Sequence, residues 1–463
     1  MKRDETVALF LQGKDAWNAW AETMLAKKAE LEKAGTWQVN NPGEGQNDAT
    51  RGWTAAASMD LSGVRFMTRA LADAPEKQAG SDEEVSAPPE GDVKTLVVED
   101  DVIGFAGFIF PWRAWFESAQ FHGLAWFESA QFHGEARFGS AQFHEQAWFV
   151  SAQFHELAGF ESAQFHEQAW FWSAQFLGQA RFGSAQFHGL AGFKNATFKA
   201  STSFRRAKFG DKKKRQDADF TGIKVERAFD MTGATFSKVP AFNQADFAQA
   251  PDLDDVRYPQ PPFFRFWVRG WEDKEKTVRR ADPLKADGAK YRHLRRLAIL
   301  GHDHENESKA FKGETRAKRG TEHYPWHAAF WFGVLYDALS DFGRSMMRPF
   351  YVWAALVIAF AFLYLWTSNA PFDGCAATAA VGLGKNLAAW SEAAYLAVKN
   401  GLIVIGLGAE SKINQAHACL YGGSIQEPVF PPGPSFAQVG QNLLSAPLIF
   451  LFLLAVRNQF KIK

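Results

Sequence analysis

One short repeat dominates the sequence: alanine and phenylalanine recur as Ala-x-Phe from Ala114 to Phe209. The step between successive phenylalanines alternates between five and six residues, so two successive Ala-x-Phe units span eleven residues, as in residues 122–132 (HGLAWFESAQF). A fixed short period of this kind predicts a solenoid, in which each unit contacts only its neighbours. Solenoids typically provide binding surfaces, so the repeat favours recognition over catalysis.

The repeat could in principle form a helix or a set of strands. An eleven-residue period fits a straight helix with a right-handed supercoil. On a helix, however, steps of five and six place successive phenylalanines on different faces, and glycines such as Gly134 and Gly178 weaken the turns. On a strand, each alanine points to the same side as the phenylalanine two positions later. The sequence therefore predicts short strands joined by sharp corners, with each Ala/Phe pair directed inward.

These units resemble the pentapeptide-repeat family, in which a small residue lies two positions before a central leucine or phenylalanine. Residues 60–66 (DLSGVRF) resemble two standard units of that family, ahead of the main array. The resemblance implies a mainly β solenoid, the right-handed quadrilateral β-helix, with four units in each coil. The extra residue in alternate units departs from the family pattern and is expected to make some corners bulge.

The repeat covers residues 103–249, and the rest of the chain divides around it. The other predicted regions are an N-terminal amphipathic helix that could cap the solenoid (1–34), a linker with a short repeat-like segment at 59–66 (35–102), a cytoplasmic helical and juxtamembrane region (250–340), and a membrane region (341–463). Within the repeat, Lys213 and Arg215 fall where an inward pair belongs. Because a charge among phenylalanine rings is costly, residues 212–215 are predicted to loop out.

With four units in each coil, outward residues 22 apart should stack into columns. One column is His122, His144, His166 and His188. Aligned histidines could ligate a metal or respond to pH. Duplication of one repeat unit explains the identical positions without any site, so neither a metal nor another cofactor is expected.

A second column consists of Trp126, Trp148 and Trp170, here called the tryptophan column. Aligned exposed indoles form an apolar strip, and such strips often mark interfaces. The alternative is that the rings only stack on one another and cover the corners. The hypothesis is that the column contacts a protein partner or a second copy of the chain in a homo-oligomer.

Charge and motif content argue against nucleic-acid binding and catalysis. The chain has 51 lysines and arginines and 51 aspartates and glutamates, so its net charge is zero. It therefore lacks the positive charge that favours nucleic-acid binding. Some pentapeptide-repeat proteins inhibit topoisomerases by imitating DNA, which requires a strongly acidic rod. Because the repeat here has mixed charge, the resemblance does not imply that activity for this chain. The sequence has no phosphate-binding glycine loop, nucleophile elbow or HExxH motif, and no enzymatic activity is expected.

Two apolar segments near the C-terminus could cross a bilayer, at about residues 349–367 and 437–456. Buried core helices are the alternative. Arg344 and Arg348 precede the first segment and Arg457 follows the second, which places both flanks in the cytoplasm by the positive-inside rule. The expected location is the bacterial inner membrane, with two spans in the lipid bilayer and both termini cytoplasmic.

The segment between these spans, residues 368–436, is then an extracytoplasmic loop. Cys375 and Cys419 fall in it and face an oxidising compartment, where they could form a disulfide. Residues 386–408 are amphipathic, then apolar, and end in Ile405-Gly406-Leu407-Gly408. A span, a re-entrant helix, a Gly-x-Gly turn and a second span are the parts of a potassium-channel pore. The filter threonines are missing, however, and a glycine stop after an ordinary helix fits equally well.

The chain ends also resemble bacterial pentapeptide-repeat membrane proteins. Residues 454–460 (LAVRNQF) resemble their membrane tail, and residues 13–20 (GKDAWNAW) resemble their N-terminal helix. The resemblance supplies no activity. The leading hypothesis is a non-enzymatic, membrane-tethered scaffold that presents its cytoplasmic solenoid to a protein partner. The alternative is an oligomeric ion-channel-like pore, or membrane effector, gated by the solenoid.

Overall fold

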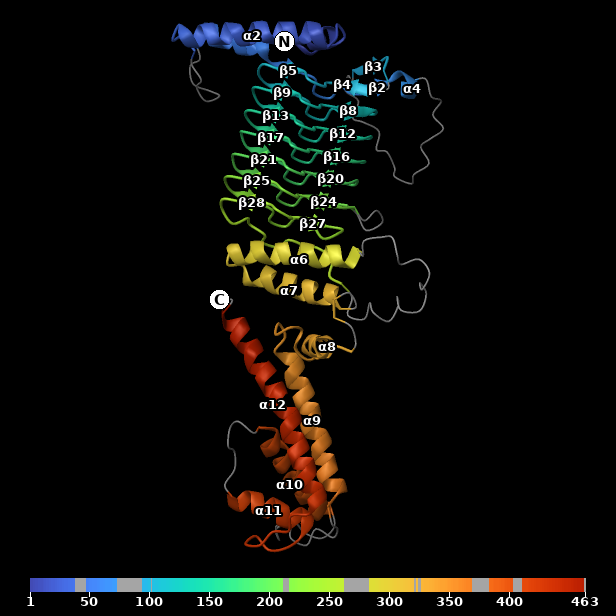
Figure 1. Ribbon diagram of the computed structural model, residues 1–463, viewed down its shortest axis with the longest axis vertical. Coiled ribbons are helices and arrows are strands. Elements are labelled where there is room, and N and C mark those ends of the chain that lie inside the picture. Colours follow the sequence, from blue (N-terminus) through green and yellow to red (C-terminus); the bar gives the residue numbers. More distant parts are fainter. Residues whose placement is uncertain are drawn as a thin grey trace. The chain divides into compact units, whose positions relative to one another are not determined.

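The computed structural model describes residues 1–37, 47–72, 94–100, 102–210, 216–261, 283–319, 322–323, 326–368, 383–402 and 410–461. The chain forms two compact units, Met1–Lys318 and Arg319–Lys463. The first holds the repeat and the second holds the apolar helices (Figure 1).

The repeat forms short parallel strands that assemble, in the described part of the chain, into four sheets, here called A to D. Sheet A contains β1 (Met59–Asp60), β6 (Ala114–Trp115), β10 (Ala136–Arg137), β14 (Ala158–Gly159), β18 (Ala180–Arg181), β22 (Thr202–Ser203) and β26 (Phe229–Asp230). Sheet B contains β3 (Thr95–Val98), β2 (Arg65–Thr68), β7 (Gln120–Phe121), β11 (Gln142–Phe143), β15 (Gln164–Phe165), β19 (Gln186–Phe187), β23 (Lys208–Phe209) and β27 (Thr235–Phe236). Sheet C contains β4 (Val102–Gly104), β8 (Leu124–Trp126), β12 (Ala147–Trp148), β16 (Ala169–Trp170), β20 (Ala191–Gly192) and β24 (Ala218–Asp219). Sheet D contains β5 (Ile109–Phe110), β9 (Gln131–Phe132), β13 (Gln153–Phe154), β17 (Gln175–Phe176), β21 (Thr197–Phe198), β25 (Lys224–Val225) and β28 (Asp246–Phe247).

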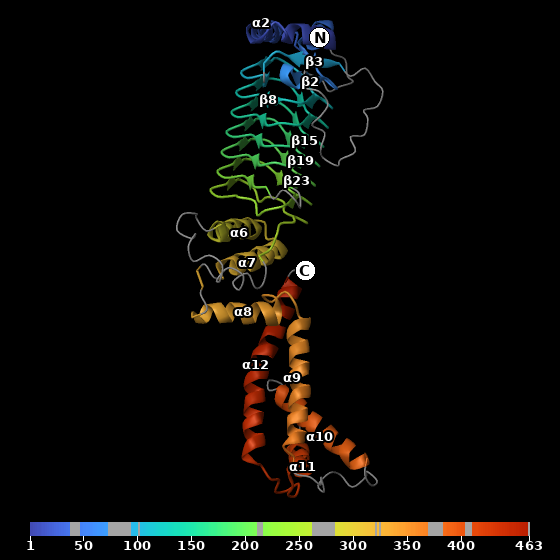
Figure 2. The ribbon, with the colours of Figure 1, turned by 90° about the vertical axis from the view of Figure 1, so that its right-hand side faces the viewer.

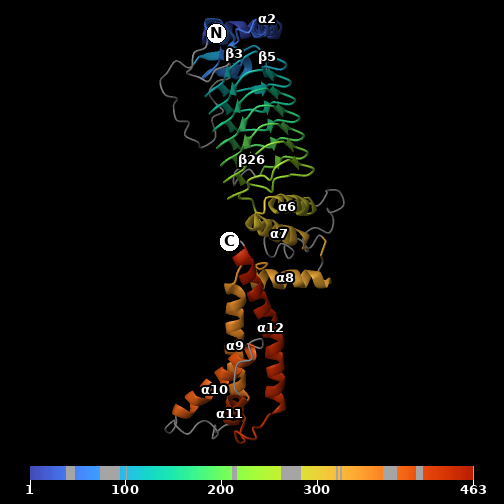
Figure 3. The same ribbon diagram turned by 90° about the vertical axis from the view of Figure 1, so that its left-hand side faces the viewer.

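Successive strands visit the four sheets in turn, and the coils stack one on another (Figure 3). Ala136 pairs with Ala114 and with Ala158, each 22 residues away, so one coil holds four repeat units. The prediction of short stacked strands with a 22-residue coil is confirmed by this register.

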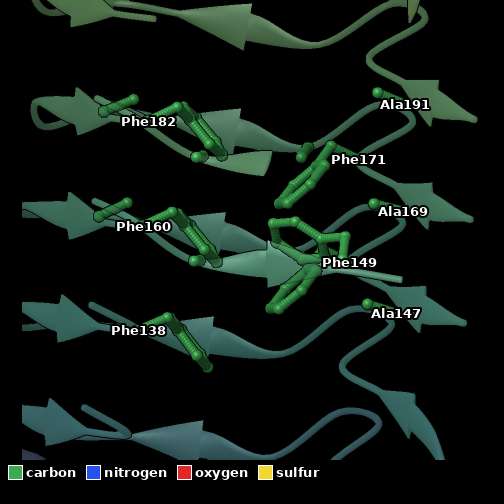
Figure 4. Close-up of a cluster of buried hydrophobic side chains, with 14 of the residues drawn as sticks. Phe138, Ala147, Phe149, Phe160, Ala169, Phe171, Phe182 and Ala191 are labelled. Carbon is green, nitrogen blue, oxygen red and sulfur yellow. The ribbon is translucent and has the colours of Figure 1, made fainter. Parts of the chain in front are cut away.

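The interior of the stack is filled by phenylalanine rings. Phe160 stacks on Phe138 and Phe182, with ring centroids 4.9 Å apart and planes within 2° of parallel (Figure 4). The neighbouring Phe149 meets Phe160 edge to face at 5.4 Å and 87°. Both arrangements are favourable for aromatic rings. The Ala/Phe pairs of the array are buried, as predicted from their spacing.

The alternating step gives the coil two kinds of corner. The five-residue steps join sheet A to B and sheet C to D, and each places one residue in the left-handed region, such as Ser118 at φ 57° and Ser129 at φ 55°. The extra residue of the six-residue steps falls at the other two corners, which begin at His122 and His133. Because the extra residue is taken up at a corner, every strand keeps its inward pair.

The loop predicted at residues 212–215 lies outside the described residues. The strands on either side of it are described, and Ala218 pairs with Ala191, 27 residues earlier instead of 22. An insertion of five residues at this corner accounts for that register, and the stack continues beyond it.

The N-terminal segment forms two helices, and the prediction of one continuous helix is wrong. Within residues 1–37, α1 (Arg3–Phe10) and α2 (Lys14–Lys33) are separated at Gly13, whose φ of +88° no helix allows. The helix α2 lies across the first coil (Figure 1). Trp17 donates its indole N–H to the carbonyl of Ile109 at 2.9 Å, and Asn18 bonds to both Gly107 O and Ile109 N. Two further helices, α3 (Asp48–Ala57) and α4 (Arg69–Ala72), follow before the array.

The other end of the stack is covered by α6 (Pro283–Leu300) and α7 (His304–Lys318). Tyr291 and Leu294 of α6 are buried in the same apolar cluster as Leu253, near the last coil. Asn306 of α7 donates a hydrogen bond to the carbonyl of Leu253 at 2.8 Å. Helices therefore cover both ends, where the unpaired strand edges of a solenoid would otherwise be exposed.

The second unit contains α8 (Ala328–Ser340), α9 (Met347–Trp366), α10 (Leu383–Gly401), α11 (Glu410–Tyr421) and α12 (Pro432–Lys461). Among the described residues, α9 and Pro432–Asn458 of α12 are long and apolar enough to cross a membrane. They cover the two spans predicted from the sequence, except that α9 ends one residue earlier, at Trp366. The region between them, predicted as an extracytoplasmic loop with a helical segment at 386–408, contains α10 and α11, and α10 packs against both α9 and α12.

Candidate interaction surface

The outward residues of the strands give each sheet a different face. Sheets B and D carry columns of glutamines, whereas sheet A carries Arg137 and Arg181. On sheet A, Arg137 pairs with Glu135 at 2.8 Å and with Glu117 at 3.7 Å, so its charge is already compensated by its own face. Only sheet C carries a run of large aromatic rings across successive described strands.

The structure places the tryptophan column on β8, β12 and β16, with Trp126 paired to Trp148 and Trp148 to Trp170. The rings are half-buried rather than fully exposed, and Trp126 meets Trp148 edge to face at 6.3 Å and 75°. Trp126 donates its indole N–H to Glu128 at 2.8 Å, and Trp148 donates to Gln146 at 2.9 Å. These N–H groups are satisfied within the solenoid, so a partner would meet mainly apolar ring surface.

Sequence reasoning missed a fourth ring, Trp172, which extends the column. Its ring lies 4.4 Å from that of Trp170, and 40% of the residue is exposed. Gly192 makes room for this pair, because a Cβ at that position would lie 2.6 Å from Trp172 Nε1 and 2.9 Å from Trp170 Cε3. A signal was present in the sequence: Trp172 occupies the corner position held by Glu128 and Val150 in other units. We call Trp126, Trp148, Trp170 and Trp172 the tryptophan patch.

The histidine column lies at the corner between sheets B and C, as a stack of parallel rings. The ring centroids of His122 and His144 are 4.2 Å apart, and those of His144 and His166 are 5.0 Å apart. At the opposite corner, His133 stacks on His155 at 4.6 Å. Burial, followed by the neighbouring histidines, lowers the pKa of His144 to about 4. Burial, followed by His155 and Lys28, lowers the pKa of His133 to about 4.

The stacked geometry does not suit a metal ion. The histidine rings face one another, whereas ring nitrogens bind metals through lone pairs that lie in the ring plane and must converge. Within the part of the chain that the structure describes, no three His, Cys, Asp or Glu side chains form a group that could hold a metal ion.

The lowered histidine pKa values predict that acid destabilises the solenoid. In the unfolded chain these two histidines bind protons below about pH 6.5. In the folded protein, His133 and His144 become protonated only near pH 4. Stability should therefore fall as the pH drops from 7 to 5, by about 1 kcal/mol for each histidine after allowance for solvent screening. The measurement is the melting temperature of the full-length protein across this range, which lies above the usual carboxylate pKa values.

The matched control replaces His133 and His144 with glutamine. The double variant should lose the part of the pH dependence between pH 7 and 5 that these two histidines contribute. A parent protein whose melting temperature stayed constant or rose as the pH fell through this window would contradict the prediction.

Two other sets of sequence-predicted residues lie wholly or partly outside the described residues. The segment Ile405–Gly408 and Cys375 lie outside the described residues. Cys419 is described and lies buried on α11. The disulfide and the pore segment therefore stay predictions.

The fold defines a class: a parallel β-solenoid with repeated aromatic filling, followed by a unit with two membrane-type helices. The family model of pentapeptide repeats, in nine copies, matches residues 105–153 and 138–186. The protein thus contains pentapeptide repeats over residues 105–186, and its C-terminal unit holds two helices apolar enough to cross a membrane. No curated protein and no solved structure matches the chain.

Proposed function

We propose that this protein is a non-enzymatic, membrane-tethered scaffold whose solenoid presents the tryptophan patch to a protein partner. A pentapeptide-repeat domain suggests a scaffold for protein interaction. The observation that carries the proposal is the patch itself, with its aligned half-buried rings beside the more exposed Trp172. We also propose that the four sheets close into a right-handed quadrilateral β-helix, because the strands visit them in a constant order.

The patch has the features of an interface centre. Tryptophan is enriched among the residues that dominate binding energy, and truncating such a residue typically costs about 2 kcal/mol or more. The indole N–H groups of Trp126 and Trp148 already have partners in the solenoid, so covering them adds no unsatisfied donor. The rings are held by a stacked sheet, so little conformational entropy is lost when a partner binds.

The proposed membrane insertion rests on α9 and α12. Only 22% of the most apolar stretch of each helix is buried, whereas a core helix of a soluble protein would be mostly buried. Ile358, Phe362 and Trp366 of α9 are exposed, and lipid would cover them. The arginines flanking both helices support a cytoplasmic location for the termini and the solenoid, in an inner membrane.

Replacing all four residues of the tryptophan patch with alanine should weaken partner binding strongly. We expect affinity to fall by at least about 30-fold, which corresponds to the loss of a single anchor of about 2 kcal/mol. The measurement is quantitative co-purification with the full-length protein from membranes of its native host, together with the mass of the purified assembly to detect a second copy.

The control variant replaces Gln131, Gln153 and Gln175 on sheet D with alanine. Both variants must keep the parent melting temperature, so that a binding defect reflects the surface. If the tryptophan variant retained every partner and the parent's oligomeric mass, the patch would not be an interface.

A second candidate function, an oligomeric pore or membrane effector gated by the solenoid, is favoured by the position of α10. Trp353 of α9 donates its indole N–H to the carbonyl of Gly401, at the end of α10, at 2.9 Å. Asn400 donates to the hydroxyl of Tyr364 at 3.1 Å, and Gln441 of α12 donates to the carbonyl of Ala397 at 2.6 Å. The end of α10 is therefore fixed between two candidate spans, as a re-entrant helix would be.

The pore is tested by electrical recording from the purified protein in planar bilayers. A pore requires several copies, because a monomer with two spans cannot enclose a conducting path. If no current is recorded in several salts and the mass in detergent is that of a monomer, this function is excluded and the scaffold remains the proposal.

A further inference from the structure

The helix α8 buries two polar side chains and exposes several large apolar ones, unlike a surface helix of a soluble protein. Phe330, Asp337 and Ser340 are buried on one side. Trp331, Phe332 and Leu335 lie on the opposite side and are exposed, with 72% of Phe332 accessible. The buried Asp337 and the exposed large apolar side chains indicate that something other than the second unit covers the outer side of α8.

The inner side of α8 is held firmly. The guanidinium of Arg319 pairs with the carboxylate of Asp337 at 2.8 Å, and both side chains are almost completely buried. Arg319 also donates to the carbonyl of Gly333 at 2.6 Å. This ion pair fixes which face of the helix points outward, because turning α8 would leave two buried charges without their partner.

The helix also lies crosswise to α9 and α12, near the start of α9 and the end of α12 (Figure 2). Contacts at the junction place it there. A Cβ added at Gly343, between α8 and α9, would lie 3.0 Å from both Asn458 of α12 and Tyr336 of α8. Arg344 and Arg457, at the same ends of the two candidate spans, are exposed. A helix at this level meets the surface of any bilayer that contains α9 and α12.

We infer that α8 is an interfacial helix whose Trp331, Phe332 and Leu335 side chains insert into the boundary between lipid headgroups and acyl chains. The inference rests on the proposed membrane insertion of α9 and α12. Lipid is favoured over a protein occupant because large apolar side chains are exposed on α8 and also on both candidate spans, which α8 contacts. Aromatic side chains are enriched at this boundary, and interfacial helices bury such a face at that depth. The exposed arginines beside it match the headgroup phosphates.

The test uses the full-length protein with a photoreactive benzoylphenylalanine in place of Phe332, reconstituted into vesicles of phosphatidylcholine and phosphatidylglycerol. Illumination should add the mass of one phospholipid, joined through acyl carbons close to the glycerol. The same probe at Ile358 of α9 should react with carbons deeper in the chain. At Gln164, on the outer face of sheet B, it should give no lipid adduct.

The outcomes separate this inference from the proposed function. If Ile358 also gave no lipid adduct, the membrane insertion of α9 would fail, and the interfacial helix with it. A lipid adduct at Ile358 without one at Phe332 would overturn only the interfacial helix. A protein dimer formed from the Phe332 probe would overturn it in favour of a second copy of the chain.

Discussion

Replacing Phe160 with alanine is expected to lower the free energy of unfolding of the solenoid by about 3–5 kcal/mol. The ring is fully buried, stacks on Phe138 and Phe182, and meets Phe149 and Phe171 edge to face at 5.4 Å. Its removal leaves a cavity, because the strands above and below are held in register by their own backbone hydrogen bonds and cannot collapse into it.

The measurement is thermal unfolding of the full-length protein, followed by tryptophan fluorescence. For a domain of this size, 1 kcal/mol shifts the melting temperature by about 2–4 °C, so a fall of roughly 6–20 °C is expected. The control is Gln164→Ala on the outward side of the same coil, which should stay within about 0.5 kcal/mol of the parent. A loss below about 1 kcal/mol for Phe160→Ala would mean that the interior is not packed as described.

Replacing Trp17 with alanine should be of comparable effect, but should act at the end of the stack. Trp17 is fully buried, packs against Phe110 at 5.5 Å, and donates its N–H to the carbonyl of Ile109. Its truncation should cost about 3–5 kcal/mol. Since it fixes α2 over the first coil, its loss should also expose strand edges that pair with other molecules.

Two measurements distinguish this variant from a general loss of stability. Hydrogen exchange should accelerate first at the backbone of residues 105–110, while the middle coils stay protected. Light scattering should show self-association on mild heating. Leu11→Ala, at an exposed position of the same segment, should behave as the parent. Uniform acceleration of exchange along the stack would contradict a local capping role for Trp17.

The strands could be predicted from the sequence because the repeat imposes the same local solution on each coil. Each unit supplies its own inward pair, so the period alone determines which side chains are buried. The histidine and tryptophan columns could be predicted in the same way, because residues 22 apart stack on successive coils. The break at Gly13 was missed because both flanking segments favour helix, and only the tertiary contacts of Phe10 and Trp17 select the bend.

Features that depend on contacts between distant segments were beyond sequence reasoning. Trp172 joins the patch because Gly192, on the next coil, leaves space for its ring, and no local pattern reports that space. The packing of α10 against α9 and α12 depends on Asn400, Tyr364 and Gln441, which are unremarkable residues until the helices meet. The burial of polar side chains on α8 likewise becomes visible only once Asp337 is seen to pair with Arg319.

The lengthened coil between Ala191 and Ala218 has a practical consequence for engineering. Five extra residues enter at the corner between sheets B and C, and the strands on both sides keep their partners. The six-residue corners are therefore sites where foreign peptides could be grafted without re-registering the interior. A binding loop placed at the His144 corner would project from the middle of a rigid support, while Phe143 and Phe149 still face inward.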